Sequence, residues 1–253
     1  ILSNIKYICN NKIYGTLMNL FWKISLFVLM LYAIIAGIAF QITPHPQTWY
    51  QFPMIPGLEE KAKIIFFHVP TAWLASLSFL MAMIYGIKYL RKQDLDDDAK
   101  SNAALQLGMM FCILATITGS IWAKFTWHSF WNWDPRETSI FILLLIYGSL
   151  FALRSAIENE DKRAKLSAVY SIIAFLTVPF FVFIMPRIMT GLHPGSADDT
   201  NAGPVIDFKM NGNMMIVFYV SLAAFTILYF WMWRLSYKSI IIEDKLSKKL
   251  ILK

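Results

Sequence analysis

Histidine and tryptophan are the side chains in this sequence whose types and spacing suggest chemistry. Four of the nine tryptophans fall between Trp122 and Trp133, within the run W-A-K-F-T-W-H-S-F-W-N-W-D-P-R-E that ends at Glu137. Indole rings bind flat aromatic ligands through offset contacts. Histidine is the commonest metal ligand in proteins. We therefore expect this segment, called the tryptophan run below, to form a platform for a flat aromatic ligand.

The four histidines are unequal candidates for such a site. His68, in I-I-F-F-H-V-P-T-A-W, precedes a proline that suits the first turn of a helix, although it could simply bond the helix end. His193, in G-L-H-P-G, lies between glycines that let the backbone bend around a ligand or form an exposed turn. His45, flanked by prolines, is interpreted as an ordinary loop residue. His128 lies inside the tryptophan run, where its ring could face water.

Tryptophan also gathers at both membrane interfaces, and this aromatic belt is the simpler explanation for any single one of these residues. A belt accounts for the other five tryptophans, but it explains four within twelve residues poorly. We therefore favour a stacking site whose members are Trp122, Trp127, Trp131 and Trp133.

The tryptophan run closes with D-P-R-E, which is typical of the start of a helix. Asp134, followed by proline and then by Glu137 at the third position, matches an N-cap, and we prefer this capping role to catalysis. Arg136, like Lys63 near His68, could pair with the carboxylates of an anionic ligand. Neighbouring glutamates could equally neutralise both cations: Glu59, Glu60 and Glu137.

The composition indicates that these residues belong to an integral membrane protein. Of the 253 residues, 57% are hydrophobic and only 15% are charged, which is far too apolar for an ordinary soluble domain. The first apolar stretch is longer than the core of a signal peptide, so we expect a retained helix. Windows of about 20 apolar residues predict an all-α polytopic protein, a single transmembrane domain over 1–253. Its six spans are 20–40, 66–90, 105–123, 138–157, 166–185 and 213–235.

The distribution of positive charge predicts the orientation of the chain. An even number of spans places both termini on one side, and most of the 23 lysines and arginines fall on that side. Because positive residues collect in cytoplasmic loops, we expect both termini in the cytoplasm, and the net charge of +7 needs no nucleic acid. The tryptophan run then forms an outer loop between helices 3 and 4. The inner loops, 94–100 and 158–165, are expected to be solvated connectors without chemistry.

Several other classes of function find little support in the sequence. Cys9 and Cys112 form no C-x-x-C pattern, which argues against a disulfide framework, a zinc ribbon or covalent haem attachment. No Gly-rich phosphate loop, nucleophile elbow or zinc-protease helix is present. The expected spans contain few ionisable residues, which disfavours a transport pathway through this protein alone.

The tryptophan run resembles the signature of the haem-handling WWD family of cytochrome c biogenesis, and its six-span CcmC (haem exporter protein C) group is the nearest match. I-I-F-F-H-V-P-T-A is similar to that family's helix-2 histidine motif, and T-G-L-H-P-G-S is similar to its third-loop histidine motif. The chain has Ala123 and His128 where the family often has glycine, and Phe125 and Phe130 where it often has proline or tryptophan. The ending W-N-W-D-P-R-E-T is closer to the larger relatives CcsA and CcmF, although the six-span length argues against them.

This resemblance implies a haem site and its residues. His68 and His193 would be axial ligands to the iron of non-covalently bound haem b. Lys63 and Arg136 would meet its propionates. The haem-contacting platform would consist of Trp122, Trp127, Trp131, Trp133 and Asp134.

The resemblance also implies a function, partners and a location. The protein would bind haem at the outer face of the membrane and pass it to a haem chaperone during c-type cytochrome maturation, without acting as an enzyme. Its partners would be a single-span CcmE-like chaperone and an ABC-type complex with a small membrane subunit, similar to CcmA, CcmB and CcmD. The expected location is the bacterial inner membrane, with the functional face in the periplasm. The alternative is a component of a cytochrome c haem lyase of the CcsA or CcmF kind.

Overall fold

A computed structural model describes the backbone of residues 2–194, 196, 210 and 212–251, and the side chains of residues 20–194, 196, 210 and 212–250. The chain is almost entirely helical, apart from two short strands near its first connection. In order, the elements are α1 Leu2–Ala39, β1 Gln41–Thr43, β2 Gln51–Pro53, the 3-10 helix η1 Glu59–Ile64, α2 Ile65–Lys92, α3 Leu95–Trp127, α4 Pro135–Ser155, α5 Glu160–Pro179, the π-helix η2 Phe180–Ile184, α6 Met185–Ile188 and α7 Gly212–Ile251.

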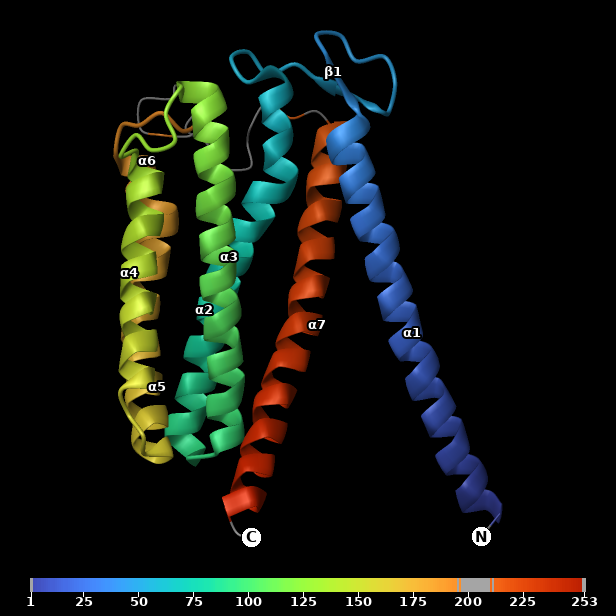
Figure 1. Ribbon diagram of the computed structural model, residues 1–253. Coiled ribbons are helices and arrows are strands. Elements are labelled where there is room, and N and C mark those ends of the chain that lie inside the picture. The colour runs from blue at the N-terminus through green and yellow to red at the C-terminus, as the bar shows by residue number, and fades with distance from the viewer. Residues whose placement is uncertain (1, 195, 197–209, 211, 252–253) are drawn as a thin grey trace.

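Six of the described segments are helical, long and apolar enough to cross a membrane, which confirms the predicted fold class. They are Leu20–Ala39, Glu59–Lys92, Leu95–Trp127, Pro135–Ser155, Glu160–Ile188 and Gly212–Leu250. Most are longer than the predicted spans, because an apolar window detects the part that crosses hydrocarbon and misses the polar turns at each end. Both ends of the chain lie at the same end of the helix bundle, and β1 and the α3–α4 connection lie at the other, called the β1 end below (Figure 1). At the end with the termini, α1 leans away from α7.

The predicted inner loop 94–100 is wrong, because α3 already begins at Leu95. Asp94 caps this helix by accepting a hydrogen bond from the backbone N–H of Asp96 at 2.9 Å. Asp98 is buried, and its carboxylate accepts hydrogen bonds of 2.8 and 2.9 Å from both terminal nitrogens of Arg154. Pairing with a guanidinium allows a carboxylate to be buried away from water, which the charge pattern alone does not reveal.

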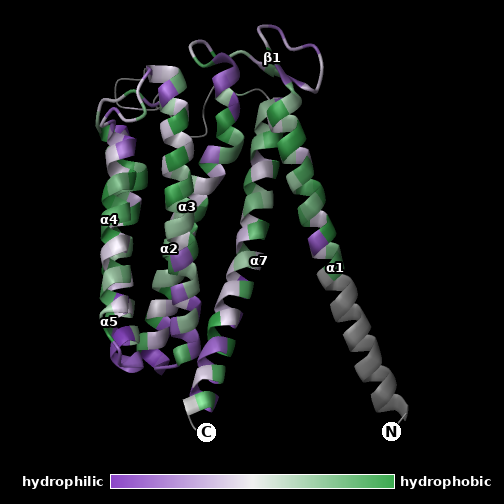
Figure 2. Ribbon diagram, in the orientation of Figure 1, coloured by the Kyte–Doolittle hydropathy of each residue, from purple (hydrophilic) through white to green (hydrophobic). Residues whose placement is uncertain are grey.

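The second predicted inner loop, 158–165, is also shorter than expected, because α5 begins at Glu160. Figure 2 shows polar residues gathered at this end of the bundle.

The proline after His68 lies inside α2, and not in its first turn as the sequence predicts. Proline lacks an N–H group, so Pro70 leaves the carbonyl oxygen of Phe66 without its usual helical partner. The buried hydroxyl of Ser221 on α7 donates a hydrogen bond to that oxygen. A side chain of α7 therefore replaces the missing hydrogen bond to Phe66 and joins α7 to α2 two residues before His68.

The two larger of the three apolar clusters among the described residues hold most of the bundle together. The larger one joins α2, α3, α4, α5 and α7, and at its centre the rings of Phe79 and Tyr147 stack with centroids 3.5 Å apart. Gly108 makes this contact possible, because a Cβ there would lie 2.6 Å from the Phe79 ring. The smaller cluster lies beneath the first connection and includes Phe52 of β2 and Phe66 of α2. Together they fix the helices that surround His68.

A histidine-lined cavity at the β1 end of the helix bundle

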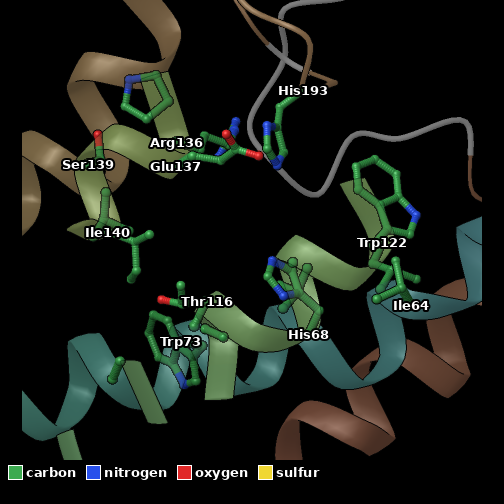
Figure 3. A pocket seen from close by; sticks show the side chains of 18 of the residues that line it. Ile64, His68, Trp73, Thr116, Trp122, Arg136, Glu137, Ser139, Ile140 and His193 are labelled. Carbon is green, nitrogen blue, oxygen red and sulfur yellow. The ribbon is translucent and has the colours of Figure 1, made fainter. Parts of the chain in front are cut away.

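A cavity of about 430 Å³ is lined by residues of α2, α3, α4, η2 and α7 and by His193 and Pro194 of the segment that follows α6. His68 and His193, which are 125 positions apart, both line it, and Figure 3 shows their rings facing the same space. The remaining walls are mainly apolar. Of the other histidines, His45 and His128 are exposed and lie outside this lining. The cavity therefore brings together the two histidines that the sequence singles out.

His68 is held against α3. Its Nδ1 lies 3.0 Å from the hydroxyl oxygen of Thr118, rather than bonding a helix end. The next residue is Gly119, where a Cβ would lie only 2.9 Å from Cε1 of the His68 ring. A side chain at position 119 would therefore push the imidazole out of place, so glycine is required for this close approach.

Asp134 organises the second histidine. Its carboxylate lies 2.7 Å from Nδ1 of His193 and also accepts hydrogen bonds from the backbone N–H groups of Leu192, at 2.7 Å, and His193, at 3.3 Å. The segment can come this close because position 191 is glycine: a Cβ there would lie 2.7 Å from the same carboxylate. One buried acid thus fixes both the backbone of this segment and the orientation of its imidazole.

The same carboxylate caps α4, which confirms the capping prediction. It accepts a hydrogen bond of 2.9 Å from the N–H of Arg136, with Pro135 in the first helical position. Burial acts to raise the pKa of Asp134, but the hydrogen bond and charge of His193, with the N–H groups of Arg136 and Leu192, lower it to about 2. Asp134 is therefore an ionised acceptor, and Nδ1 of His193 is the donor in their contact.

The tryptophan run is not the continuous outer loop that the sequence predicts. Helix α3 continues through Trp127 and ends where His128 adopts a left-handed conformation, with φ of 63°. Only residues 128–134 connect it to α4. Trp133 also has a positive φ, of 56°, which is strained for a bulky side chain and is seen most often at functional sites.

The four tryptophans form two edge-to-face pairs rather than one flat layer. Trp122 and Trp127 meet at 81° with centroids 4.9 Å apart, and both contact the His193 ring, at 5.9 and 4.7 Å. Trp131 and Trp133 meet at 89° and pack against a phenylalanine of α4. Trp122 and Trp131 line the cavity, whereas Trp127 and Trp133 do not. The first pair therefore supports an imidazole, and one ring of each pair faces the cavity.

The two predicted cationic contacts differ in their surroundings. Arg136 lines the cavity beside His193, and among the described residues it forms no ion pair with a carboxylate (Figure 3). Lys63 forms an ion pair of 2.7 Å with Glu60, donates a hydrogen bond to the carbonyl of Ile38, and is not part of the lining. The glutamate partner that the sequence leaves open is thus present for Lys63, and none is found for Arg136 among the described residues, where its guanidinium contacts the carbonyl of Pro194 at 3.5 Å.

Glu137 is a polar group of the cavity wall that sequence reasoning treats only as part of a helix start. Its Oε2 accepts a hydrogen bond of 2.7 Å from the N–H of Asn132, while the buried Oε1 has no partner among the described residues. Thr118 and Gly119 are also missed, because their contacts with His68 join two different helices. A threonine and a glycine inside an apolar helix give only a weak signal of such contacts.

The residues fit haem better than a metal ion held by protein side chains alone. Among the residues that the structure describes, no three histidine, cysteine, aspartate or glutamate side chains converge as a metal site would need. Two imidazoles do face one apolar cavity, and the described residues contribute no hydrogen bond to the Nε2 atom of either ring. Beside them lies the guanidinium of Arg136, which has no carboxylate partner among the described residues and donates a 3.5 Å hydrogen bond to the carbonyl of Pro194. This donor set suits a planar tetrapyrrole with two nitrogen ligands and acidic edge groups.

Comparison with known proteins identifies relatives of the chain. The family model described as "Heme exporter protein C" matches residues 6–251. The chain is 32% identical over 167 residues to a Heme exporter protein C of Bradyrhizobium diazoefficiens, covering 66% of this chain and 62% of that protein. It is 31% identical over 167 residues to the same-named protein of Paracoccus denitrificans, covering 66% and 68%. It is also 33% identical over 110 residues to the cytochrome c biogenesis protein CcsA of Spinacia oleracea, covering 43% and 33%.

Proposed function

The chain belongs to the Heme exporter protein C family, and on this premise we propose that it binds haem between His68 and His193 and delivers it for the maturation of c-type cytochromes. The observation that carries the proposal is the convergence of these two imidazoles, from α2 and from the segment after α6, on one apolar cavity. The aligned stretch covers about two thirds of the curated relatives, so activity, cargo and partners are all part of the proposal.

The protein's own contribution is to bind and orient its cargo. The iron of haem accepts two nitrogen ligands, and His68 and His193 would supply them through Nε2. Trp122 and Trp131 would contact the porphyrin from the cavity wall, and the Arg136 guanidinium would pair with a propionate. The apolar walls would exclude water from the ring. None of these groups makes or breaks a covalent bond, so we propose non-covalent binding of haem b by a transfer protein rather than an enzyme.

The remaining members of the proposed site would support the residues that contact haem. Asp134 would hold the His193 imidazole, Trp127 would pack against the same ring, and Trp133 would support Trp131. Lys63 would have to leave its ion pair with Glu60 to meet a propionate. The proposed propionate contact therefore rests mainly on Arg136.

The proposal includes a location and a set of partners. We place the protein in the bacterial inner membrane with both termini in the cytoplasm, because lysine and arginine concentrate at that end of the bundle. The haem cavity would then open towards the periplasm. The receiving partner would be a CcmE-like haem chaperone, and the neighbours in the membrane would be an ABC-type complex similar to CcmA and CcmB with a small CcmD-like subunit.

A lyase component of the CcsA kind is the alternative, and the match to a CcsA protein over 110 residues is the observation that favours it. A lyase would need a site for an apocytochrome beside the haem. Purified protein that forms the covalent bond between haem and a C-x-x-C-H peptide would support the lyase. Transfer of haem to a chaperone without such a bond would support the carrier.

The ligand assignment has a direct test with a matched control. Replacing His68 and His193 together by alanine should remove the haem absorbance of the purified protein. The control replaces the two exposed histidines, His45 and His128, and should leave the spectrum unchanged. An unaltered spectrum in the first double variant would show that haem is held elsewhere.

A further inference from the structure

The two cavity histidines differ in the group that holds them. Nδ1 of His193 lies 2.7 Å from the carboxylate of Asp134, whereas Nδ1 of His68 lies 3.0 Å from the neutral hydroxyl of Thr118. Hydrogen bonds to an ionised acceptor are shorter and roughly twice as strong as those between neutral groups. This inequality is a property of the protein chain itself, whatever the cavity contains.

The hydrogen bonds of Thr118 determine which His68 nitrogen carries the proton. A threonine hydroxyl has one hydrogen, and Thr118 lies 2.8 Å from the carbonyl oxygen of Leu114 and 3.2 Å from that of Ala115, both in its own helix. A carbonyl can only accept, so the hydroxyl hydrogen points into the helix and the hydroxyl oxygen accepts from the imidazole. Nδ1 of His68 is therefore protonated. Its lone pair lies on Nε2, the atom that a metal in the cavity would need.

The partner of an imidazole also tunes its strength as a ligand. A carboxylate that accepts from Nδ1–H increases the electron density of the ring, and such partners commonly change metal affinity by about 10–100-fold. A neutral hydroxyl that already donates its hydrogen elsewhere has a weaker effect. Asp134 also anchors the backbone around His193 through two further hydrogen bonds. The histidine on the connecting segment is thus tied more tightly than its position outside a helix would suggest.

We propose that Thr118 is a positioning residue that fixes the tautomer of His68, and that its neutral hydroxyl makes His68 the weaker haem ligand, the one that leaves the iron first when haem is passed on. The proposal rests on the haem-binding function proposed above. The site would then have an order of release, in which His193 would keep its bond to the iron after His68 had given way to a receiving ligand.

The first test needs no haem. In protein labelled with ¹⁵N-histidine, the ring nitrogen shifts of His68, assigned by their loss in His68→Gln, should report a proton on Nδ1. Thr118→Ser keeps the hydroxyl and should preserve this tautomer, whereas the isosteric Thr118→Val should populate both tautomers. Unchanged His193 shifts would show that the fold is intact. A single Nδ1–H tautomer in Thr118→Val would overturn the positioning role.

A second measurement on the same variants concerns affinity. Haem binding should weaken about 10-fold in Thr118→Val and stay near wild type in Thr118→Ser. Equal affinities in the wild type and Thr118→Val would contradict the role of the hydroxyl in holding the ligand.

The order of release is tested with the haem-loaded wild type. After reduction, carbon monoxide replaces one axial ligand and gives a diamagnetic complex, in which the ¹⁵N shifts identify the freed imidazole. The freed ring should be His68. Release of His193, or of both rings equally, would overturn the order. If the double variant of His68 and His193 retained haem, the proposed function would fail, and the tautomer measurement would still test Thr118 by itself.

Discussion

Replacement of Asp134 by asparagine isolates the charge of the group that holds His193. Asparagine is nearly as good an N-cap as aspartate, so the start of α4 should tolerate the change. The amide cannot supply two charged acceptor oxygens, however, and Asp134 uses them on the imidazole and on the N–H groups of Leu192 and His193. The variant therefore weakens the hydrogen bonds that hold His193 and leaves the helix in place.

The size of the effect follows from these contacts. Hydrogen bonds to charged groups contribute about 1.5–3 kcal/mol each, and loss of the partner of a metal-binding histidine typically costs about 10–100-fold in affinity. We therefore expect Asp134→Asn to bind haem at least about 10-fold more weakly than the wild type. Most of the loss should appear as faster release, because the walls of the cavity are unchanged.

The assay is a haem titration of detergent-solubilised apoprotein, followed by the transfer rate to an excess of apomyoglobin. The matched control is Asp94→Asn, since Asp94 caps α3 in the same way at the end of the bundle with the termini, where it has no histidine partner. The control should bind haem like the wild type and report any general cost of losing an acidic cap. Equal haem affinity and equal release rates in the two variants would refute the role given to Asp134.

Three other variants have expected outcomes. Gly119→Ala places a methyl group 2.9 Å from the nearest ring atom of the α2 histidine and should weaken haem binding several-fold in the same titration, whereas Gly148→Ala, with open space around it, should not. Arg136→Ala should weaken the binding of haem but hardly that of haem dimethyl ester, which lacks the acidic groups; equal losses for both would exclude a propionate contact. Arg154→Met leaves the buried carboxylate of Asp98 without its partner and should destabilise the protein by about 3–5 kcal/mol in thermal or denaturant unfolding, with haem affinity unchanged.

The spans could be predicted because they depend on composition, whereas the pairing of the two histidines was implied by the resemblance to the WWD family. Apolar windows reveal where helices are long enough to cross a membrane, and the structure brings both histidine motifs to one cavity. The start of α3 at Leu95, on the side of the termini, could not be found in this way. The burial of Asp98 depends on Arg154, and these residues are 56 positions apart in the chain.

The supporting contacts of the site were hidden for the same reason. His68 and Thr118 are separated by 50 positions, and Asp134 and His193 by 59. No local pattern joins such pairs, because the helix packing that brings them together is a property of the whole bundle. The D-P-R-E motif correctly predicted a cap, but a capping carboxylate can accept further hydrogen bonds. Only the folded chain reveals that Asp134 also accepts one from the His193 imidazole.

The π-helical turn between α5 and α6 determines which side chains the fifth span presents to the cavity. Phe181, Val182 and Phe183 are consecutive and all three are among the residues that line the cavity, as the wider π-helical turn allows. The extra residue in this turn widens one side of the helix and resets the phase of everything after it. Shortening the turn by one residue would rotate the following segment by about 100° and carry His193 away from His68. The distance between these two imidazoles thus depends partly on a π-helical turn in a helix that contains neither of them.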